Sequence, residues 1–250
     1  CPSVSRYNFH AYSAGGRLAM GLAVLEDRFG YTNDYLDILY RCNMCGACDV
    51  SCKCNKDLEN FAIAQELRIK AIEDGQLLPA HMAVIDGLKK EDNMMLAKKA
   101  DRGKWAEGMN LKNVTTDKVD VYLHIGCRYS FDEELWPIVK AAARLLTKAG
   151  VNFGIAGKDE NCCGGRAYEL GYVGEFTKYA ENNIEMLKTA GVKTVVTLCS
   201  DGYHAFKVRY PQMGLKGDYK VYHITEYLEQ LIKAGKLKLT KRVPMAVTYH

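Results

Sequence analysis

Apolar residues recur at three- and four-residue spacing over two stretches in the first part of the chain. One stretch runs from about residue 14 to 40 and the other from about residue 58 to 72. The repeating positions are Leu18, Leu22, Leu25, Phe29, Leu36 and Leu39, followed by Leu58, Phe61, Ile63, Leu67 and Ile72. This spacing places the apolar side chains on one face of an α-helix. We therefore expect the first region to be helical.

A different pattern begins after a charged, turn-rich stretch at about 89–118, where we expect only one short helix, near Met94 to Lys99. Short β-rich runs then alternate with helical ones. The expected strands are "VDVYLHI", "VNFGIA", "VKTVVTL" and 219–222, and the expected helices are 135–146, 167–188, 203–208 and 225–232. Strands that alternate with helices in this way predict a parallel α/β unit.

These patterns predict an α + α/β fold class with a helical domain at 1–88, a linker at 89–118 and an α/β domain at 119–240. The last stretch, "RVPMAVTYH", begins like "KVDVYLHIGC", so we expect 241–250 to start a second, truncated copy of the α/β domain. A terminal strand that completes the first sheet is the alternative. Because the first residue is Cys1 and not Met, we expect the sequence to begin inside a longer protein.

Composition narrows the functional classes. The chain has 250 residues, of which 48% are hydrophobic, enough for two domain cores. The net charge of +4 comes from scattered basic residues, so we expect no nucleic-acid partner. No apolar run approaches the roughly 20 residues that cross a bilayer, so we expect no transmembrane segment. The ten cysteines are clustered, which favours metal ligation in a reducing compartment over secreted disulfides.

The first cysteine group lies in "YRCNMCGACDVSCKC". Cys42, Cys45, Cys48 and Cys52 follow the C-x2-C-x2-C-x3-C spacing of bacterial ferredoxins, in which three thiolates hold one 4Fe-4S cluster and the fourth cysteine serves another. Zinc sites usually need two pairs of ligands, which this run does not offer.

One ligand of that cluster is still missing from the run. In the ferredoxin pattern it is the last cysteine of a partner run and precedes a proline, as Cys1 precedes Pro2 here. We therefore expect Cys42, Cys45, Cys48 and Cys1 to hold one cluster, and Cys52 to serve a second cluster whose other ligands lie upstream. Cys54 is interpreted as a spare, packed cysteine.

The second cysteine group is spread over the α/β domain. Cys127 and Cys199 each end an expected strand, and the Cys162–Cys163 pair in "ENCCGGR" separates a strand from a helix. Because ligands of parallel sheets bind at the carboxyl ends of the strands, we expect these four sulfurs to converge.

Two other interpretations of this group stay open. The four cysteines could be inert and structural, or one of them could form a catalytic pair with His204. The histidines at 81, 124, 204 and 223 lack metal-ligand spacing, so we interpret them as surface or satisfied core residues.

The second group, with "CCGG" and "CSDGY", resembles the cysteine-rich CCG domain of heterodisulfide reductase, and the helical two-cluster module ahead of it resembles the fused, D-type form of that enzyme. Iron-sulfur subunits of glycolate and lactate oxidases and of anaerobic aromatic acyl-CoA reductases are similar. The resemblance implies two CCG domains in the full protein. It also implies a noncubane pair of clusters where such a domain carries five cysteines, but Gly202 stands at the fifth position here.

The resemblance also implies a function. We expect an iron-sulfur electron-transfer subunit of an anaerobic oxidoreductase complex, which relays electrons between a flavoprotein or carrier and a reductase partner. A catalytic heterodisulfide reductase subunit is the alternative. The expected cofactors are two 4Fe-4S clusters in the ferredoxin module, with a further one in the CCG domain left open. The expected partners are flavin-containing and other redox subunits, and the expected location is cytoplasmic, with peripheral attachment to a membrane left open.

Overall fold

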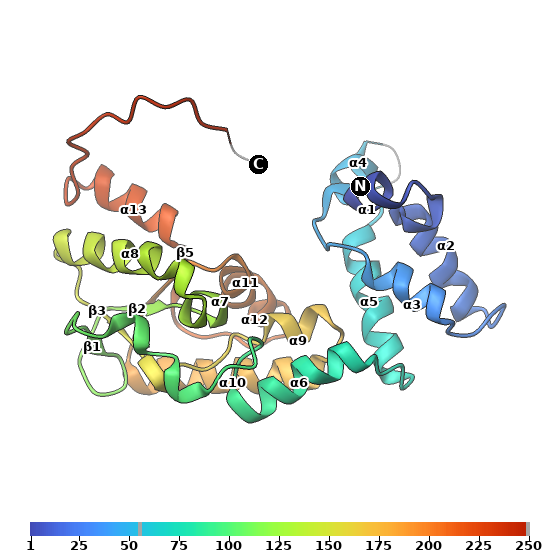
Figure 1. Cartoon of the computed structure of the whole chain (residues 1–250), viewed down its shortest axis with the longest axis horizontal. Coiled ribbons are helices and arrows are strands. Elements are labelled where there is room, and N and C mark those ends of the chain that lie inside the picture. The colour runs from blue at the N-terminus through green and yellow to red at the C-terminus, as the bar shows by residue number, and fades with distance from the viewer. Residues whose placement is uncertain (55–56, 249–250) are drawn as a thin grey trace. The chain divides into compact units, whose positions relative to one another are not determined.

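Helices make up most of the chain before residue 92, and a parallel sheet with covering helices makes up most of the rest (Figure 1). The computed structural model describes residues 1–54 and 57–248. They divide into two units, Cys1–Asp86 with Gly164–Lys178 and Gly87–Cys163 with Tyr179–His250. The helix-then-α/β fold class expected from the sequence is confirmed. The domain limits expected from the sequence stay a prediction.

The helices before residue 92 follow the predicted pattern. They are α1 (Pro2–Tyr7), η1 (His10–Tyr12), α2 (Ala14–Leu25), α3 (Asn33–Tyr40), α4 (Ala47–Lys53), α5 (Asn60–Glu73) and α6 (Pro79–Glu91). The apolar core of the first unit joins α3 and α5 through Tyr35, Leu36, Leu39, Leu67 and Ala71. This core supports the loop between α3 and α4, which carries three of the cysteines.

The remaining elements alternate as the sequence indicates. They are η2 (Lys99–Asp101), η3 (Lys104–Ala106), β1 (Lys112–Asn113), β2 (Val121–His124), α7 (Cys127–Phe131), η4 (Glu133–Leu135), α8 (Trp136–Lys148), β3 (Phe153–Ile155), η5 (Gly157–Asp159), α9 (Gly165–Glu169), α10 (Val173–Ala190), β4 (Thr194–Thr197), α11 (Ser200–His204), η6 (Ala205–Arg209), α12 (Tyr210–Gln212), β5 (Lys220–His223) and α13 (Ile224–Lys233). η6 is a single π-helical turn.

The sheet has the strand order β1-β3-β2-β4-β5, and every neighbouring pair is parallel. Its register pairs Val121 with Phe153 on one side and with Thr194 on the other. Because all strands run the same way, the segments after β2, β3 and β4 leave the sheet at one edge. These segments carry the four cysteines of the second group.

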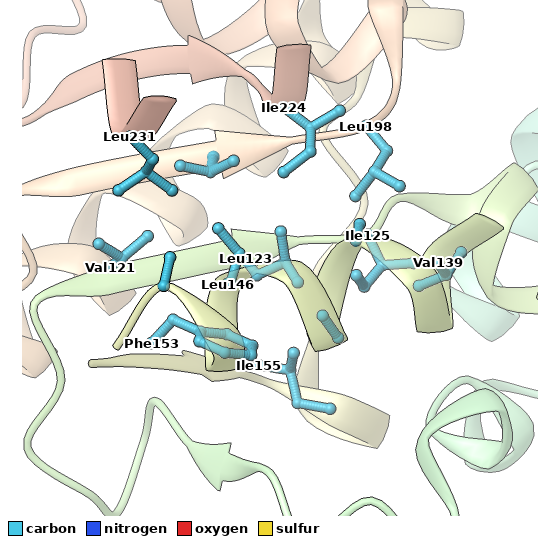
Figure 2. Packing of buried hydrophobic residues seen from close by; sticks show 14 of the residues in the cluster. Val121, Leu123, Ile125, Val139, Leu146, Phe153, Ile155, Leu198, Ile224 and Leu231 are labelled. Carbon is cyan, nitrogen blue, oxygen red and sulfur yellow. The ribbon is translucent and has the colours of Figure 1, made fainter. Parts of the chain in front are cut away.

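One face of the sheet packs against α8 and α13 to form the main core (Figure 2). Val121 and Leu123 point into this core together with Leu146 and Leu231. Tyr122 and His124 alternate with them along β2, so their side chains point to the opposite face. All four residues of β2 are buried, as is typical of a parallel strand that is covered on both faces.

Two predicted helices differ from the structure. The short helix expected near 94–99 is wrong, because the Asn93 side chain accepts hydrogen bonds from Met95 N (3.0 Å) and Ala97 N (3.1 Å) and so organises a loop instead. The helix expected at 167–188 is divided into α9 and α10 by Gly171, whose φ is 96°. A Cβ at Gly171 would lie only 2.5 Å from Arg68 O, so only glycine fits against α5 there.

The end of the chain has no regular structure where it is described. Residues 238–248 form neither helix nor strand, and residues 249–250 lie outside the described part. The terminal strand that was considered for this segment is therefore not seen in 241–248, and the second CCG domain stays a prediction. Among the described helices, none combines the length and apolar character needed to cross a membrane.

Candidate functional site

Five cysteines of the first unit line one cavity of about 510 Å³. They are Cys1, Cys42, Cys45, Cys48 and Cys52. The cysteines predicted as ligands in this unit are therefore brought together. Cys54 is exposed and does not line the cavity, so its interpretation as a packed core residue is wrong.

Local backbone geometry turns these cysteines inward. Met44 (φ 51°) and Gly46 (φ 72°) both have left-handed conformations, which fold the 42–48 loop back on itself. Cys52 lies four residues after Cys48 and one turn further along α4, so both face the same side. At the other wall, Ser3 Oγ donates a hydrogen bond to Arg41 O (2.5 Å) and holds the start of α1 beside the loop.

Two arginines are buried in the first unit. Arg17 Nε donates to Ile38 O (2.7 Å) and Nη1 to Tyr12 O (2.6 Å), whereas Nη2 is buried and has no hydrogen-bond partner among the described residues. Arg17 also lines the cysteine cavity. Burial lowers the pKa of this arginine, and the nearby Cys42 and Cys48 thiols act in the opposite direction.

The second buried arginine supports the loop from behind. Arg68 Nη2 donates to Cys42 O (2.7 Å) and to Leu39 O (3.3 Å), and its Nη1 donates to Glu169 O (2.9 Å). The end of α3, the first cysteine of the loop and the end of α9 are thus joined through α5. We expect this bonding to keep the cavity in shape.

The residues of this cavity fit an iron-sulfur cluster. The donors are soft thiolates, which suit cluster iron. The buried Nη2 of Arg17 provides a cationic N–H donor without a partner among the described residues, and an anionic cluster would satisfy it. The five sulfurs line one cavity without a visible division, so the assignment of Cys52 to a second cluster stays a prediction.

Cysteines of the second group meet at the carboxyl edge of the sheet. Cys127 Sγ lies 3.5 Å from Cys162 Sγ, and both residues are buried. Cys199 follows β4, and its Sγ lies 3.8 Å from where a Cβ on Gly126 would be. Cys163 is buried beside Cys162, and its carbonyl oxygen accepts a hydrogen bond from Tyr210 Oη (2.8 Å).

Buried charge stands next to the Cys127–Cys162 contact. Arg102 is 1% exposed, and its Nη2 lies 3.5 Å from Cys127 Sγ while its Nη1 binds Glu160 Oε1 at 2.9 Å. Glu160 also accepts hydrogen bonds from Ile125 N and Gly126 N, both at 2.9 Å. This carboxylate therefore fixes both the arginine and the turn that leads into Cys127.

The pKa values follow from these contacts. Burial acts to lower the pKa of Arg102, but Cys127 and Glu160 raise it above its usual value. Burial acts to raise the pKa of Glu160, but His124, Arg102 and the two backbone N–H groups lower it. The pair is therefore ionised. The hydrogen bond to Cys162, together with burial, raises the pKa of the Cys127 thiol, so the metal-free site holds this cysteine as a thiol.

The Cys162–Cys163 turn is held from two sides. Asp92 Oδ1 accepts a hydrogen bond from Cys162 N (3.0 Å), and its Oδ2 pairs with Lys99 Nζ (2.8 Å). Asn183 Nδ2 in α10 donates to Cys162 O (2.8 Å). The donor set and this rigid surround fit a metal cluster bound by thiolates. Within residues 1–54 and 57–248, no three His, Cys, Asp or Glu side chains lie close enough to hold a single metal ion.

Sequence reasoning missed several residues of this site. Glu160 precedes the cysteine pair in "DENCCGG", and a carboxylate at that place was a usable signal. Arg102 and Asp92 lie in the turn-rich stretch, where no motif marks them. His124 was interpreted as a surface or satisfied core residue, yet its Nε2 is buried and has no hydrogen-bond partner in the described part of the chain.

Comparison with known protein families places the second group. Residues 121–207 match the family of CCG cysteine-rich domains, over a segment that contains all four of these cysteines. This segment is a CCG cysteine-rich domain. Its cysteines follow the strands of a parallel sheet, as the resemblance seen in the sequence implied. No solved structure matches the chain.

Curated relatives extend the similarity beyond the CCG domain. The EtfAB:quinone oxidoreductase of Syntrophomonas wolfei is 41% identical over 144 residues, which are 58% of this chain and 20% of the relative. The D-type subunit of the dihydromethanophenazine:CoB–CoM heterodisulfide reductase of Methanosarcina acetivorans is 29% identical over 222 residues, 87% of this chain and 53% of the relative. The probable iron-sulfur-binding oxidoreductase FadF of Bacillus subtilis is 26% identical over 251 residues, 96% of this chain and 35% of the relative.

These relatives are oxidoreductases or their subunits, and the Bacillus protein is named for iron-sulfur binding. The chain spans between about a fifth and about half of the length of the three relatives described. The similarity to D-type heterodisulfide reductase that the sequence indicated is confirmed.

Proposed function

We propose that this chain is an iron-sulfur electron-transfer subunit of an anaerobic oxidoreductase complex, and that it relays electrons between a flavoprotein or carrier and a reductase partner. The observation that carries the proposal is the cavity of about 510 Å³ lined by five cysteines and the buried Arg17. A 4Fe-4S cluster bound there would supply one-electron exchange. The names of the relatives support redox work in a larger assembly.

The ligands follow from the residues that line the sites. Cys1, Cys42, Cys45 and Cys48 hold one 4Fe-4S cluster, and Cys52 serves a second one whose other ligands lie elsewhere in the full protein. In the CCG domain, Cys127, Cys162, Cys163 and Cys199 hold a further cluster. The protein tunes these clusters through buried positive charge, since Arg17 lines the first cavity and Arg102 contacts Cys127 Sγ.

Disulfide cleavage at this CCG domain is the weaker candidate. The resemblance implies five cysteines for a disulfide-cleaving noncubane centre, but the fifth position is Gly202. A Cβ at Gly202 would already lie 3.2 Å from Thr197 Oγ1, so the backbone there is closely surrounded. Relay of electrons needs no fifth thiolate and no substrate site.

Anoxic purification of the natural complex, followed by rapid mixing, tests the proposal. We expect flavin-containing and other redox subunits to co-purify with this chain. We also expect its visible iron-sulfur absorbance to bleach when a reduced flavoprotein partner is added. The chain without partners should show no turnover of a disulfide substrate. Disulfide reduction by the chain alone, with electrons from an artificial donor, would contradict the relay function.

A further inference from the structure

His124 is a fully buried histidine with one satisfied and one unsatisfied ring nitrogen. It ends β2, its side chain is 0% exposed, and its Nε2 has no hydrogen-bond partner among the described residues. An uncompensated polar atom of this kind costs about 1–3 kcal/mol. A core histidine of ordinary structural role would have both nitrogens satisfied.

The other ring nitrogen fixes the tautomer. Tyr122 Oη lies 3.1 Å from His124 Nδ1 and donates its own proton to Glu160 Oε2 at 3.4 Å. The tyrosine oxygen therefore accepts a hydrogen bond from Nδ1–H, and Glu160 Oε2 lies only 3.7 Å from Nδ1. With the proton on Nδ1, the unprotonated nitrogen is Nε2, which presents its lone pair.

That lone pair lies beside the CCG-domain cysteines. A Cβ built on Gly126 would be 3.9 Å from His124 Nε2 and 3.8 Å from Cys199 Sγ, so the nitrogen and the sulfur border the same space. A Cβ built on Gly202 would be 3.6 Å from Nε2. The histidine nitrogen thus faces the backbone position at which the resemblance implies a fifth cysteine.

The surroundings keep the ring in this orientation. Phe206 packs edge-on against the imidazole with the ring centroids 5.0 Å apart, and Tyr122 does the same from the other side at 5.6 Å. Histidines that ligate metals commonly donate their second N–H toward a carboxylate or another oxygen, which orients the ring and makes the ligating nitrogen more basic. The Tyr122–Glu160 arrangement has this form.

We propose that His124 Nε2 is a nitrogen ligand of the iron-sulfur cluster in the CCG domain, in place of the thiolate that Gly202 cannot provide. This inference rests on the proposed function, because it requires the CCG cysteines to hold a cluster. Ligation uses the Nε2 lone pair, leaves the proton on Nδ1 and changes no oxidation state. Replacing thiolate by imidazole raises the reduction potential of a cluster, as Rieske centres illustrate.

The test is pulsed EPR of the anoxically prepared full chain, labelled with ¹⁵N-histidine or with natural nitrogen and poised at potentials that make each cluster paramagnetic. We expect one cluster to show the strong hyperfine coupling of a directly bound histidine nitrogen, with the isotope change confirming its origin. No histidine is among the described residues that line the cavity of the first unit, so the coupling would report on the CCG domain.

Substitutions assign the coupling to one residue. His124→Gln should abolish it, whereas His204→Gln, the same change at an exposed histidine of the same domain, should leave it intact. If His124→Gln fails to fold, the labelled wild-type chain still decides the matter. A cluster in the CCG domain without histidine coupling would overturn this inference alone. A chain whose CCG domain holds no iron would overturn both the inference and the proposed cluster in that domain.

Discussion

Buried arginines stand beside both cysteine groups, and their charge is the main residue-scale means of tuning electron transfer. Arg17 is held by two backbone carbonyls and keeps Nη2 toward the first cavity. Arg102 is held by Glu160 and contacts Cys127. Reduction adds negative charge to a cluster, so a fixed cation nearby favours the reduced state.

Arg17→Gln should therefore lower the reduction potential of the cluster in the first unit. We expect a fall of tens of millivolts, where about 59 mV corresponds to a tenfold change in a one-electron equilibrium. EPR-monitored redox titration measures it. The control is Arg28→Gln, at an exposed arginine that pairs with Glu26 on the surface, and it should leave the potential unchanged. An unchanged potential in Arg17→Gln, with iron content intact, would remove Arg17 from the account.

The Arg102–Glu160 pair should also stabilise the second unit. Glu160→Gln leaves a buried guanidinium without its counter-ion, and breaking a buried pair costs about 3–5 kcal/mol. Both tryptophans, Trp105 and Trp136, lie in this unit, so denaturant unfolding of the metal-free chain can be followed by their fluorescence. Asp218→Asn breaks the exposed pair with Lys193 and should cause no measurable loss. Equal effects of the two substitutions would contradict the structural role of Glu160.

At the scale of elements, short backbone features aim the cysteines. The loop between α3 and α4 depends on left-handed residues, and the CCG cysteines depend on strands that end at a common edge. Spacing and periodicity predicted both features, because both are local in sequence. The Asn93 loop was mistaken for a helix because side-chain hydrogen bonds, which leave no periodic pattern, replace the helical ones.

Gly46→Ala tests the loop. No atom lies within 4 Å of a Cβ added there, but the φ of 72° disfavours any L-residue with a side chain, at a cost of roughly 1–2 kcal/mol. We expect less iron in the first unit and an unchanged CCG-domain signal, as measured by iron analysis and EPR. Gly30→Ala, which is equally uncrowded but lacks a positive φ, is the matched control. Full iron content in Gly46→Ala would mean that the loop does not need this conformation.

At the scale of the whole molecule, the sequence predicted the helix-then-α/β order, the cysteine groups and the CCG domain, but not the polar residues around them. Arg102 and Glu160 are 58 residues apart, and nothing in the local sequence of Arg102 indicates that they meet. His124 has the alternation of a buried strand residue, and only its tertiary neighbours leave Nε2 unsatisfied. Ligand spacing is a short-range signal, whereas the contacts that tune a site are long-range.

The central claim is that the chain holds iron-sulfur clusters on the predicted cysteines. Iron and acid-labile sulfide analysis, combined with low-temperature EPR of the reduced, anoxically prepared full chain, tests it most directly. We expect cubane signals in the wild type, loss of one cluster in Cys45→Ala and no loss in Cys54→Ala, because Cys45 lines the cavity and Cys54 does not. A colourless preparation that contains only zinc, or equal cluster loss in both variants, would contradict the account.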